Sequence, residues 1–309
     1  MHTVYNAIFE PGFFGSTQVH IAATIGGLVA IVSAVTGVFT VMRGQSFGGH
    51  ALSDVSAAGG AGAVLVGLSP VIGFVGLGMV GAGVMDMIGV RRLRGRDLAT
   101  GIVLGTAIGL SALFLYLTST HSATTGATQQ VLFGSIFVTP ADTIPIVVGL
   151  SALALGALAA VCRPLLLTTV SPDIAASRGV PVRAVGLLYM LALAISVGLS
   201  SLAIGAILST ALLIGPPAAA LRLARRTSHA IGLACLFGVA ATWIGILLAY
   251  DSYYWGTAHE ALPVSFFVVA VVFAGYLLTG LASARTARHL AAPAAAAGAA
   301  ATERDEIAA

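Results

Sequence analysis

The stretch GGHALSDVSAAGGAGAVLVGLSP, residues 48–70, decides how this chain is interpreted. It contains His50 and Asp54, four residues apart in a largely apolar segment. On a helix these two side chains lie one turn apart on the same face, with their Cβ atoms about 5–6 Å apart. An imidazole and a carboxylate at that spacing can hold one divalent cation between them. The stretch therefore predicts a metal site formed by His50 and Asp54.

Small residues follow the pair, namely Ala57, Ala58, Gly59, Gly60 and Gly62. Small side chains allow helices to approach one another closely inside a membrane. We therefore expect the helix that carries His50 and Asp54 to be tightly packed against its neighbours.

The composition places most of the chain in a lipid bilayer. Of its 309 residues, 58% are hydrophobic and only 8% are charged, whereas soluble proteins carry about 25% charged residues. The basic residues are 14 arginines, with no lysine. Since those arginines lie in short loops, they indicate topology and do not indicate nucleic-acid binding. Cys162 and Cys235 fall in apolar segments, where we expect buried thiols and no disulfide framework.

Windows of about 20 apolar residues predict an all-α integral membrane protein with eight or nine transmembrane helices. The runs cover residues 20–42, 50–68, 71–90, 98–118, 143–163, 184–199, 201–221, 229–250 and 263–284. Only the small-residue run 198–201 separates the sixth from the seventh, so these are either two spans or one broken element. We assign residues 1–19 to an extracytoplasmic segment, 20–286 to the transmembrane domain, and 287–309 to a low-complexity cytoplasmic tail.

Arginines recur in alternate loops. They fall at residues 43, 91–96, 163, 178–183, 222–226 and 285–288. The intervening loops, 119–142 and 251–262, contain no arginine. Because cytoplasmic loops carry the excess of positive charge, this alternation predicts an extracytoplasmic N-terminus, nine crossings and a cytoplasmic C-terminus.

The absence of lysine also excludes a standard P-loop ATPase, because the Walker A motif requires a lysine on the phosphates. If ATP drives transport, it must be hydrolysed on a separate subunit. The polar segment TTVSPDIAASRGVPVR, residues 168–183, is a candidate docking site for that subunit.

In this segment Ser171 can cap a short helix, with Pro172 at its first position and Asp173 in its first turn. Gly179 can end the helix. The pattern predicts a helix of about two turns between two spans, which has the form of a coupling helix. The alternative is an ordinary ordered loop.

The seventh run ends in ALLIGPPAAALRLARR, residues 211–226. Pro216 and Pro217 interrupt helical hydrogen bonding there. They mark either a flexing point or a simple kink or helix end.

Four motifs, in collinear order, carry a resemblance to a known family. They are Arg43 with GHALSDV (49–55), LFGSIFVTPAD (132–142), SPDIAASRG (171–179) and LLIGPPAAA (212–220). Together they resemble the membrane-spanning permeases of bacterial ABC importers for zinc, manganese or iron, over about residues 12–284. In the family the aspartate precedes the histidine, so His50 and Asp54 are exchanged in order. Ser135 stands where the family often has aspartate, and we assign it no metal role.

The resemblance implies a multi-pass protein of the bacterial cytoplasmic membrane that is a transport subunit and not itself an enzyme. It implies a homodimer around one pathway, with His50 and Asp54 as transient ligands of the transported zinc or manganese. It also implies two partners, an extracytoplasmic metal-binding protein and a cytoplasmic ATP-binding subunit. The residues expected to contact the ATP-binding subunit are Ser171, Pro172, Asp173, Ala176 and Gly179.

Three alternatives stay open at this point. A proton-coupled secondary transporter could use His50 and Asp54, although such proteins typically show an internal repeat and no clear repeat is present. An intramembrane metalloprotease requires H-E-x-x-H or an equivalent, which is absent. The His50–Asp54 pair could also serve only to hold two helices together by a hydrogen bond.

Overall fold

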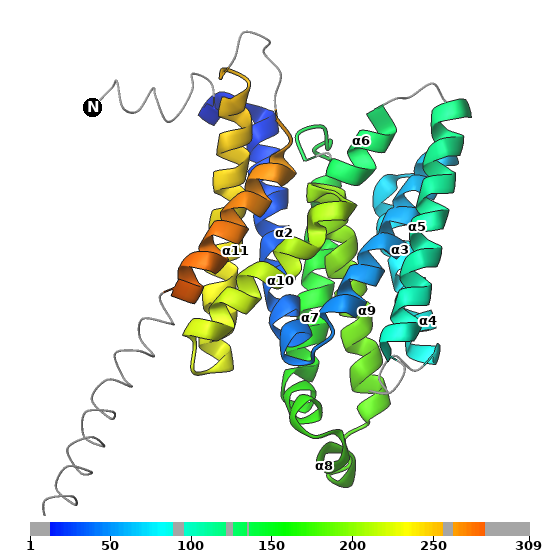
Figure 1. Cartoon of the computed structure of the whole chain (residues 1–309), viewed down its shortest axis with the longest axis vertical. Helices are drawn as coiled ribbons and strands as arrows, with labels where there is room; N and C mark the ends of the chain where they lie inside the picture. Colours follow the sequence, from blue (N-terminus) through cyan, green and yellow to red (C-terminus); the bar gives the residue numbers. More distant parts are fainter. Residues whose placement is uncertain (1–12, 89–95, 122–125, 135, 256–261, 282–309) are drawn as a thin grey trace, which may run out of the picture.

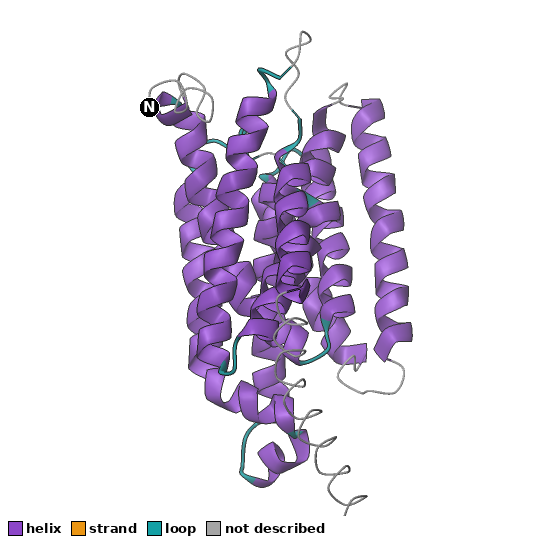
Figure 2. Cartoon of the chain, turned by 60° about the vertical axis from the view of Figure 1, so that its left-hand side comes forward, coloured by secondary structure: helices purple, strands orange, loops and turns teal. Residues whose placement is uncertain are grey.

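The computed structural model describes residues 13–88, 96–121, 126–134, 136–255 and 262–281. Every regular element in these ranges is a helix (Figure 2). The helices are η1 (Phe13–Gly15), α2 (Thr17–Met42), α3 (Ser46–Leu65), α4 (Pro70–Ile88), α5 (Arg96–His121), α6 (Gly126–Phe133), α7 (Thr143–Val170), α8 (Pro172–Ser177), α9 (Val182–Ile204), α10 (Ala206–Leu223), α11 (Thr227–Ser252) and a last helix, Val264–Leu281. The predicted all-α membrane class is confirmed. The loops with Arg91, Ser135 and Arg285 lie outside the described residues.

Seven helices in the described ranges are long and apolar enough to cross a membrane. They are α2, α4, residues Thr100–Thr120 of α5, α7, α9, α11 and Val264–Leu281. The predicted count of eight or nine is too high by this measure. The 20-residue helix α3 is less apolar because His50, Asp54 and several serines and glycines occupy it. It nevertheless packs inside the bundle against α4, α5, α9 and α10 (Figure 1).

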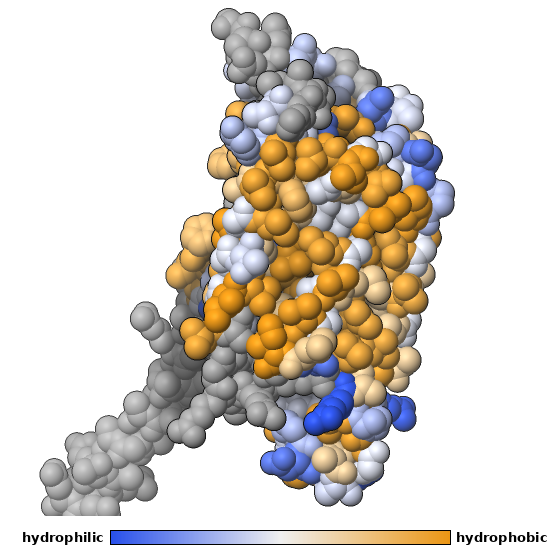
Figure 3. Space-filling model, turned by 90° about the vertical axis from the view of Figure 1, so that its right-hand side faces the viewer, coloured by the Kyte–Doolittle hydropathy of each residue, from blue (hydrophilic) through white to orange (hydrophobic). Residues whose placement is uncertain are grey.

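The surface is divided as expected for a protein embedded in lipid. Figure 3 shows a broad apolar band on the face that carries α5, with hydrophilic side chains gathered at the two ends. Exposed apolar side chains of α5 and α4 include Ile102 and Leu113 of α5 and Val80 of α4. A patch of this extent in water would be an aggregation site, whereas in a bilayer it contacts acyl chains.

The boundary between α9 and α10 differs from the predicted one. The small-residue run 198–201 lies inside α9, and the chain breaks at Gly205, which has φ 95°. This backbone conformation favours glycine. Gly134, at the end of α6, packs directly on the break, because a Cβ on Gly134 would lie 2.5 Å from the Ala203 carbonyl oxygen. The two runs are therefore two helices, and α6 lies against their junction.

Helix α7 is longer than predicted. It continues past Arg163 to Val170, with Pro164 inside the helix. A proline removes one backbone hydrogen bond, which a helix of 28 residues tolerates here. The extension carries the chain beyond its neighbours, so that α8 lies at one extreme of the molecule, at the bottom of Figure 1.

Glycines bring α3 into direct backbone contact with α4. A Cβ built on Gly59 would lie 2.1 Å from the carbonyl oxygen of Gly73, and one on Gly60 would lie 2.4 Å from the ring of Phe74. A Cβ on Gly62 would lie 3.1 Å from the ring of Phe114 in α5. The predicted close packing of this segment is confirmed.

We expect Gly59→Ala to lower the thermal unfolding midpoint of the purified protein in detergent. The added methyl group meets the Gly73 backbone, and overpacking of this kind costs about 1–3 kcal/mol. Gly76→Ala is the matched control, since a Cβ there has no neighbour within 4 Å and alanine is the better helix former. Equal midpoints for the two variants would contradict the contact between α3 and α4.

Candidate functional site

His50 and Asp54 lie on the same face of α3, as their spacing predicted. The His50 Nε2 and Asp54 Oδ2 atoms are 3.8 Å apart. The side chains are 38% and 15% exposed, respectively. Together with Phe47 they form the exposed face of the first half of a helix whose other residues are mostly buried. Two ionisable side chains therefore lie at the surface of this chain, on a helix that is otherwise mostly buried.

The separation of these two atoms suits a bridging cation. Bonds of about 2.0–2.2 Å to nitrogen and oxygen place two ligand atoms about 3.4 Å apart around a tetrahedral ion. The observed 3.8 Å requires only a small rotation of either side chain to reach that value. In the described part of the chain, no group of three or more His, Cys, Asp and Glu side chains could hold a metal. The pair therefore offers two ligands.

The other ring nitrogen of His50 contacts a different helix. His50 Nδ1 lies 2.9 Å from the hydroxyl Oγ1 of Thr210 in α10. Sequence reasoning missed Thr210, which stands 160 positions further along the chain. No local pattern distinguishes this threonine from the other hydroxyl residues in apolar spans.

Buried hydroxyl groups join α3 to the break between α9 and α10. The Ser53 hydroxyl donates to the Ala206 carbonyl oxygen at 3.0 Å and lies 3.2 Å from the Ser201 hydroxyl. The Ser209 hydroxyl oxygen lies 2.5 Å from that of Ser53 and 3.0 Å from the Ala206 carbonyl oxygen. The three serine side chains are at most 1% exposed. They hold α3 at the start of α10, one turn from His50.

Arg43 connects three helices at the end of the bundle nearest α8. Its Nη1 donates to the hydroxyls of Thr168 and Thr169 in α7, at 3.2 and 3.3 Å. Its guanidinium carbon lies 5.1 Å from the ring centroid of Tyr189 in α9. The Tyr189 hydroxyl in turn lies 2.8 Å from that of Thr40 in α2. The sequence had assigned Arg43 only a topological meaning and a place in a motif.

Helix α8 has the predicted form. The Ser171 side chain accepts a hydrogen bond from the Ile174 backbone N–H at 3.4 Å, Pro172 stands at the first turn, and Asp173 lies in that turn. Gly179 has φ 77° and donates to the Ala176 carbonyl oxygen at 3.0 Å. The cap, the first turn and the left-handed glycine therefore delimit the helix where the sequence predicted.

The exposed surface of α8 is available to another protein. Ala175 is fully buried, whereas Pro172, Asp173 and Ala176 are exposed. Ile174 is also exposed, at 51%. Docking of an ATP-binding subunit on these residues stays a prediction.

Pro216 and Pro217 lie inside α10, which continues to Leu223, so they do not mark a helix end. Proline at 217 leaves the Leu213 carbonyl oxygen without its helical donor. Gly37 of α2 packs against that oxygen, since a Cβ on Gly37 would lie 1.9 Å from it. The two buried prolines therefore belong to the contact between α10 and α2, and a role in flexing stays a prediction.

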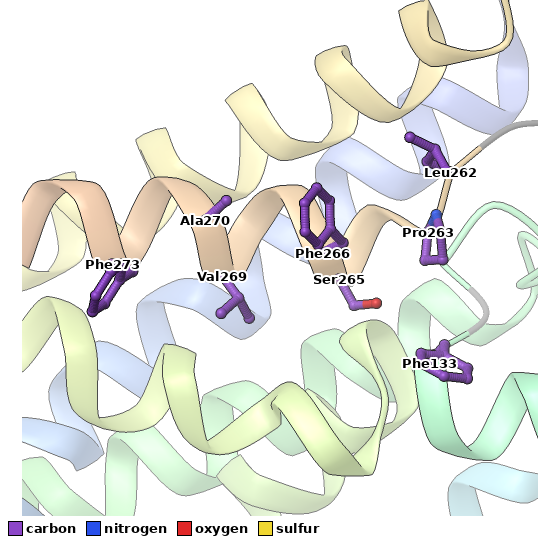
Figure 4. Close-up of a pocket in the computed structure, with 8 residues that line it drawn as sticks. All are labelled: Phe133, Leu262, Pro263, Ser265, Phe266, Val269, Ala270 and Phe273. Carbon is purple, nitrogen blue, oxygen red and sulfur yellow. The ribbon is translucent and has the colours of Figure 1, made fainter.

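A cavity of about 560 Å³ lies apart from the His50–Asp54 pair. Its lining residues are Phe133, Leu262, Pro263, Ser265, Phe266, Val269, Ala270 and Phe273 (Figure 4). The hydroxyl of Ser265 is the polar side-chain group among them. The lining suits an apolar group and offers no ligand set for a cation.

The chain is similar in sequence to known membrane proteins. The sequence profile described as "ABC 3 transport family" matches residues 17–278. The chain is 30% identical over 233 residues to the "Manganese transport system membrane protein MntC" of Halalkalibacterium halodurans, covering 74% of this chain and 78% of that protein. It is 27% identical to the "High-affinity zinc uptake system membrane protein ZnuB" of Haemophilus influenzae, covering 75% and 88%.

The fold has a counterpart among solved structures. A chain of PsaBC from Streptococcus pneumoniae, in complex with a Fab, superimposes with a TM-score of 0.75 and 24% identity. The match covers 90% of this chain and 95% of that chain.

Proposed function

The chain belongs to the ABC 3 transport family, and we propose that its His50–Asp54 pair holds the transported cation on its way through the membrane. As a family member, the protein is the membrane permease subunit of an ATP-driven importer for a divalent transition metal, manganese or zinc. It is a multi-pass protein of the bacterial cytoplasmic membrane. Family membership favours ATP-driven import over the proton-coupled alternative.

One observation carries the proposed site. His50 and Asp54 are two ionisable side chains on the exposed face of an otherwise buried helix, 3.8 Å apart. Ionisable groups at membrane depth are costly and face a bundle interior or a water-filled path. Two ligands suit a site that an ion must enter and leave, because a full ligand set would hold the ion too tightly for transport.

The same exposure supports a homodimer. A side chain that is 38% exposed, as His50 is, cannot face acyl chains without a large penalty. A second copy of the chain would cover this face and present its own histidine and aspartate to the pathway. Four ligands from two copies match the coordination number that zinc prefers.

We propose that a separate cytoplasmic ATP-binding subunit docks on α8 and that an extracytoplasmic metal-binding protein delivers the cation. The exposed residues Asp173, Ile174 and Ala176 would form the docking surface. Arg43 supplies a physical route from that surface to the cation pair. It contacts the end of α7 directly before α8, and it precedes α3 in the chain.

We expect His50→Ala and Asp54→Ala each to lower ATP-dependent uptake of manganese or zinc by at least about tenfold, as loss of a metal ligand or of its support does. The measurement is uptake into vesicles that contain this chain with its ATP-binding subunit and metal-binding protein. Assembly of each complex is checked first.

His20→Ala is the control, because the His20 imidazole bonds to the Phe14 carbonyl oxygen at 2.7 Å and belongs to a different part of the molecule. Undiminished uptake in both assembled His50 and Asp54 variants would reduce the pair to a packing role and contradict the proposal.

We expect Gly179→Val to weaken binding of the ATP-binding subunit about fivefold or more, because a non-glycine residue in the left-handed region costs about 1–2 kcal/mol. Gly179 has φ 77°, and a Cβ built there would have no neighbour within 4 Å, so the effect is conformational and not steric. Gly156→Val, at an open helical position in α7, is the control. The measurement is the dissociation constant of the two subunits in detergent, and equal constants for both variants would argue against docking on α8.

A further inference from the structure

We propose that Thr210 of α10 is the positioning residue that makes His50 competent to bind the transported cation. This inference rests on the proposed function, since it concerns the same site. It is carried by the 2.9 Å distance between His50 Nδ1 and Thr210 Oγ1. A second observation supports it: the other ring nitrogen, Nε2, faces Asp54 and lies 3.8 Å from Asp54 Oδ2.

The two ring nitrogens of a neutral imidazole have different roles. One carries the proton and donates, while the other has a lone pair and can ligate a metal. A hydroxyl oxygen has two lone pairs and can accept from Nδ1–H. With the proton held on Nδ1, the lone pair is on Nε2, the atom that faces Asp54. When the Thr210 hydroxyl accepts from Nδ1–H, the contact holds His50 in the tautomer in which Nε2 and Asp54 can share one cation.

The same contact fixes the orientation of the ring. Metal-binding histidines generally donate their second N–H to a fixed acceptor, which sets the ring plane. His50 is 38% exposed, so packing alone leaves its ring free to rotate. The hydrogen bond to Thr210 removes that freedom and lowers the ordering cost of capturing an ion.

The type of acceptor suits transient binding. A carboxylate acceptor strengthens a histidine ligand by increasing its basicity, whereas a threonine hydroxyl is uncharged. Thr210 thus orients His50 without turning it into a strong ligand, which is the balance that a transported ion requires.

The position of Thr210 also links the site to the broken helix. Thr210 follows Ser209, whose hydroxyl bonds to Ser53 of α3, and it lies in the first half of α10 after the break at Gly205. His50 and Thr210 belong to different helices, so any movement of α10 away from α3 would release the Nδ1 bond. The ligand would then lose its orientation at the moment the two helices part.

The test compares Thr210→Val, which keeps the side-chain shape and removes the hydroxyl, with Thr210→Ser, which keeps the hydroxyl. Uptake of manganese and zinc is measured as a function of metal concentration in vesicles containing the complete importer. Thr242→Val is the control, because the Thr242 hydroxyl donates within its own helix, to the Gly238 carbonyl oxygen at 2.9 Å, and the side chain is fully buried. The KM does not depend on how much transporter assembles, so a partial folding defect cannot imitate the result.

We expect Thr210→Val to raise the KM for the metal about tenfold, the lower end of the effect of removing a partner of a metal-bound histidine, with a much smaller change in maximal rate. Thr210→Ser should restore the wild-type KM, and Thr242→Val should not alter it. An unchanged KM in Thr210→Val, or an equal rise in Thr210→Ser, would overturn the proposal. If His50→Ala itself keeps the wild-type KM, the cation site of the proposed function fails first, and that outcome is separate from a failure of Thr210 alone.

Discussion

Direct backbone contact between α3 and α4 is the constraint on which the rest of the bundle depends. Gly59 and Gly73 approach so closely that neither position has room for a Cβ. Inside a bilayer, helices associate through packing and hydrogen bonds because lipid offers no hydrophobic drive between them. The glycine contact allows α3, which carries His50, Asp54 and several serines, to pack against α4, α5, α9 and α10. A polar helix is thereby kept in the protein interior, with only its His50–Asp54 face open.

Burial of a polar helix requires that its hydrogen-bonding groups find partners. The break at Gly205 interrupts the regular ladder between α9 and α10, and in lipid an unsatisfied backbone group is costly. At this break the hydroxyl oxygens of Ser53 and Ser209 each lie 3.0 Å from the Ala206 carbonyl oxygen. The same serines fix α3 against α10. The serine cluster at the break therefore also places α3, and with it His50 and Asp54, against α10.

Contacts of Arg43 connect the region of α8, the proposed docking surface, with the helix that carries His50 and Asp54. Arg43 joins α2 to the end of α7 and lies over the ring of Tyr189 in α9. Helix α8 stands between α7 and α9, so displacement of α8 would act on both flanking helices and on Arg43. The next helix in the chain after Arg43 is α3. A contact network of two hydroxyls, one guanidinium and one aromatic ring thus bridges the exposed end of the molecule and the helix of the cation pair.

The sequence by itself determined those features that depend on residues within one or two helical turns of each other. These include the all-helical membrane class, the capped helix α8 with Gly179 at its end, the close-packing face of α3, and the shared face of His50 and Asp54. Only the tertiary structure decided which residues meet across the bundle. Thr210 reaches His50 from 160 positions away, and Gly134 at the end of α6 packs against the helix break at Gly205. Local propensity carries no information about such contacts, since they arise from the packing of whole helices.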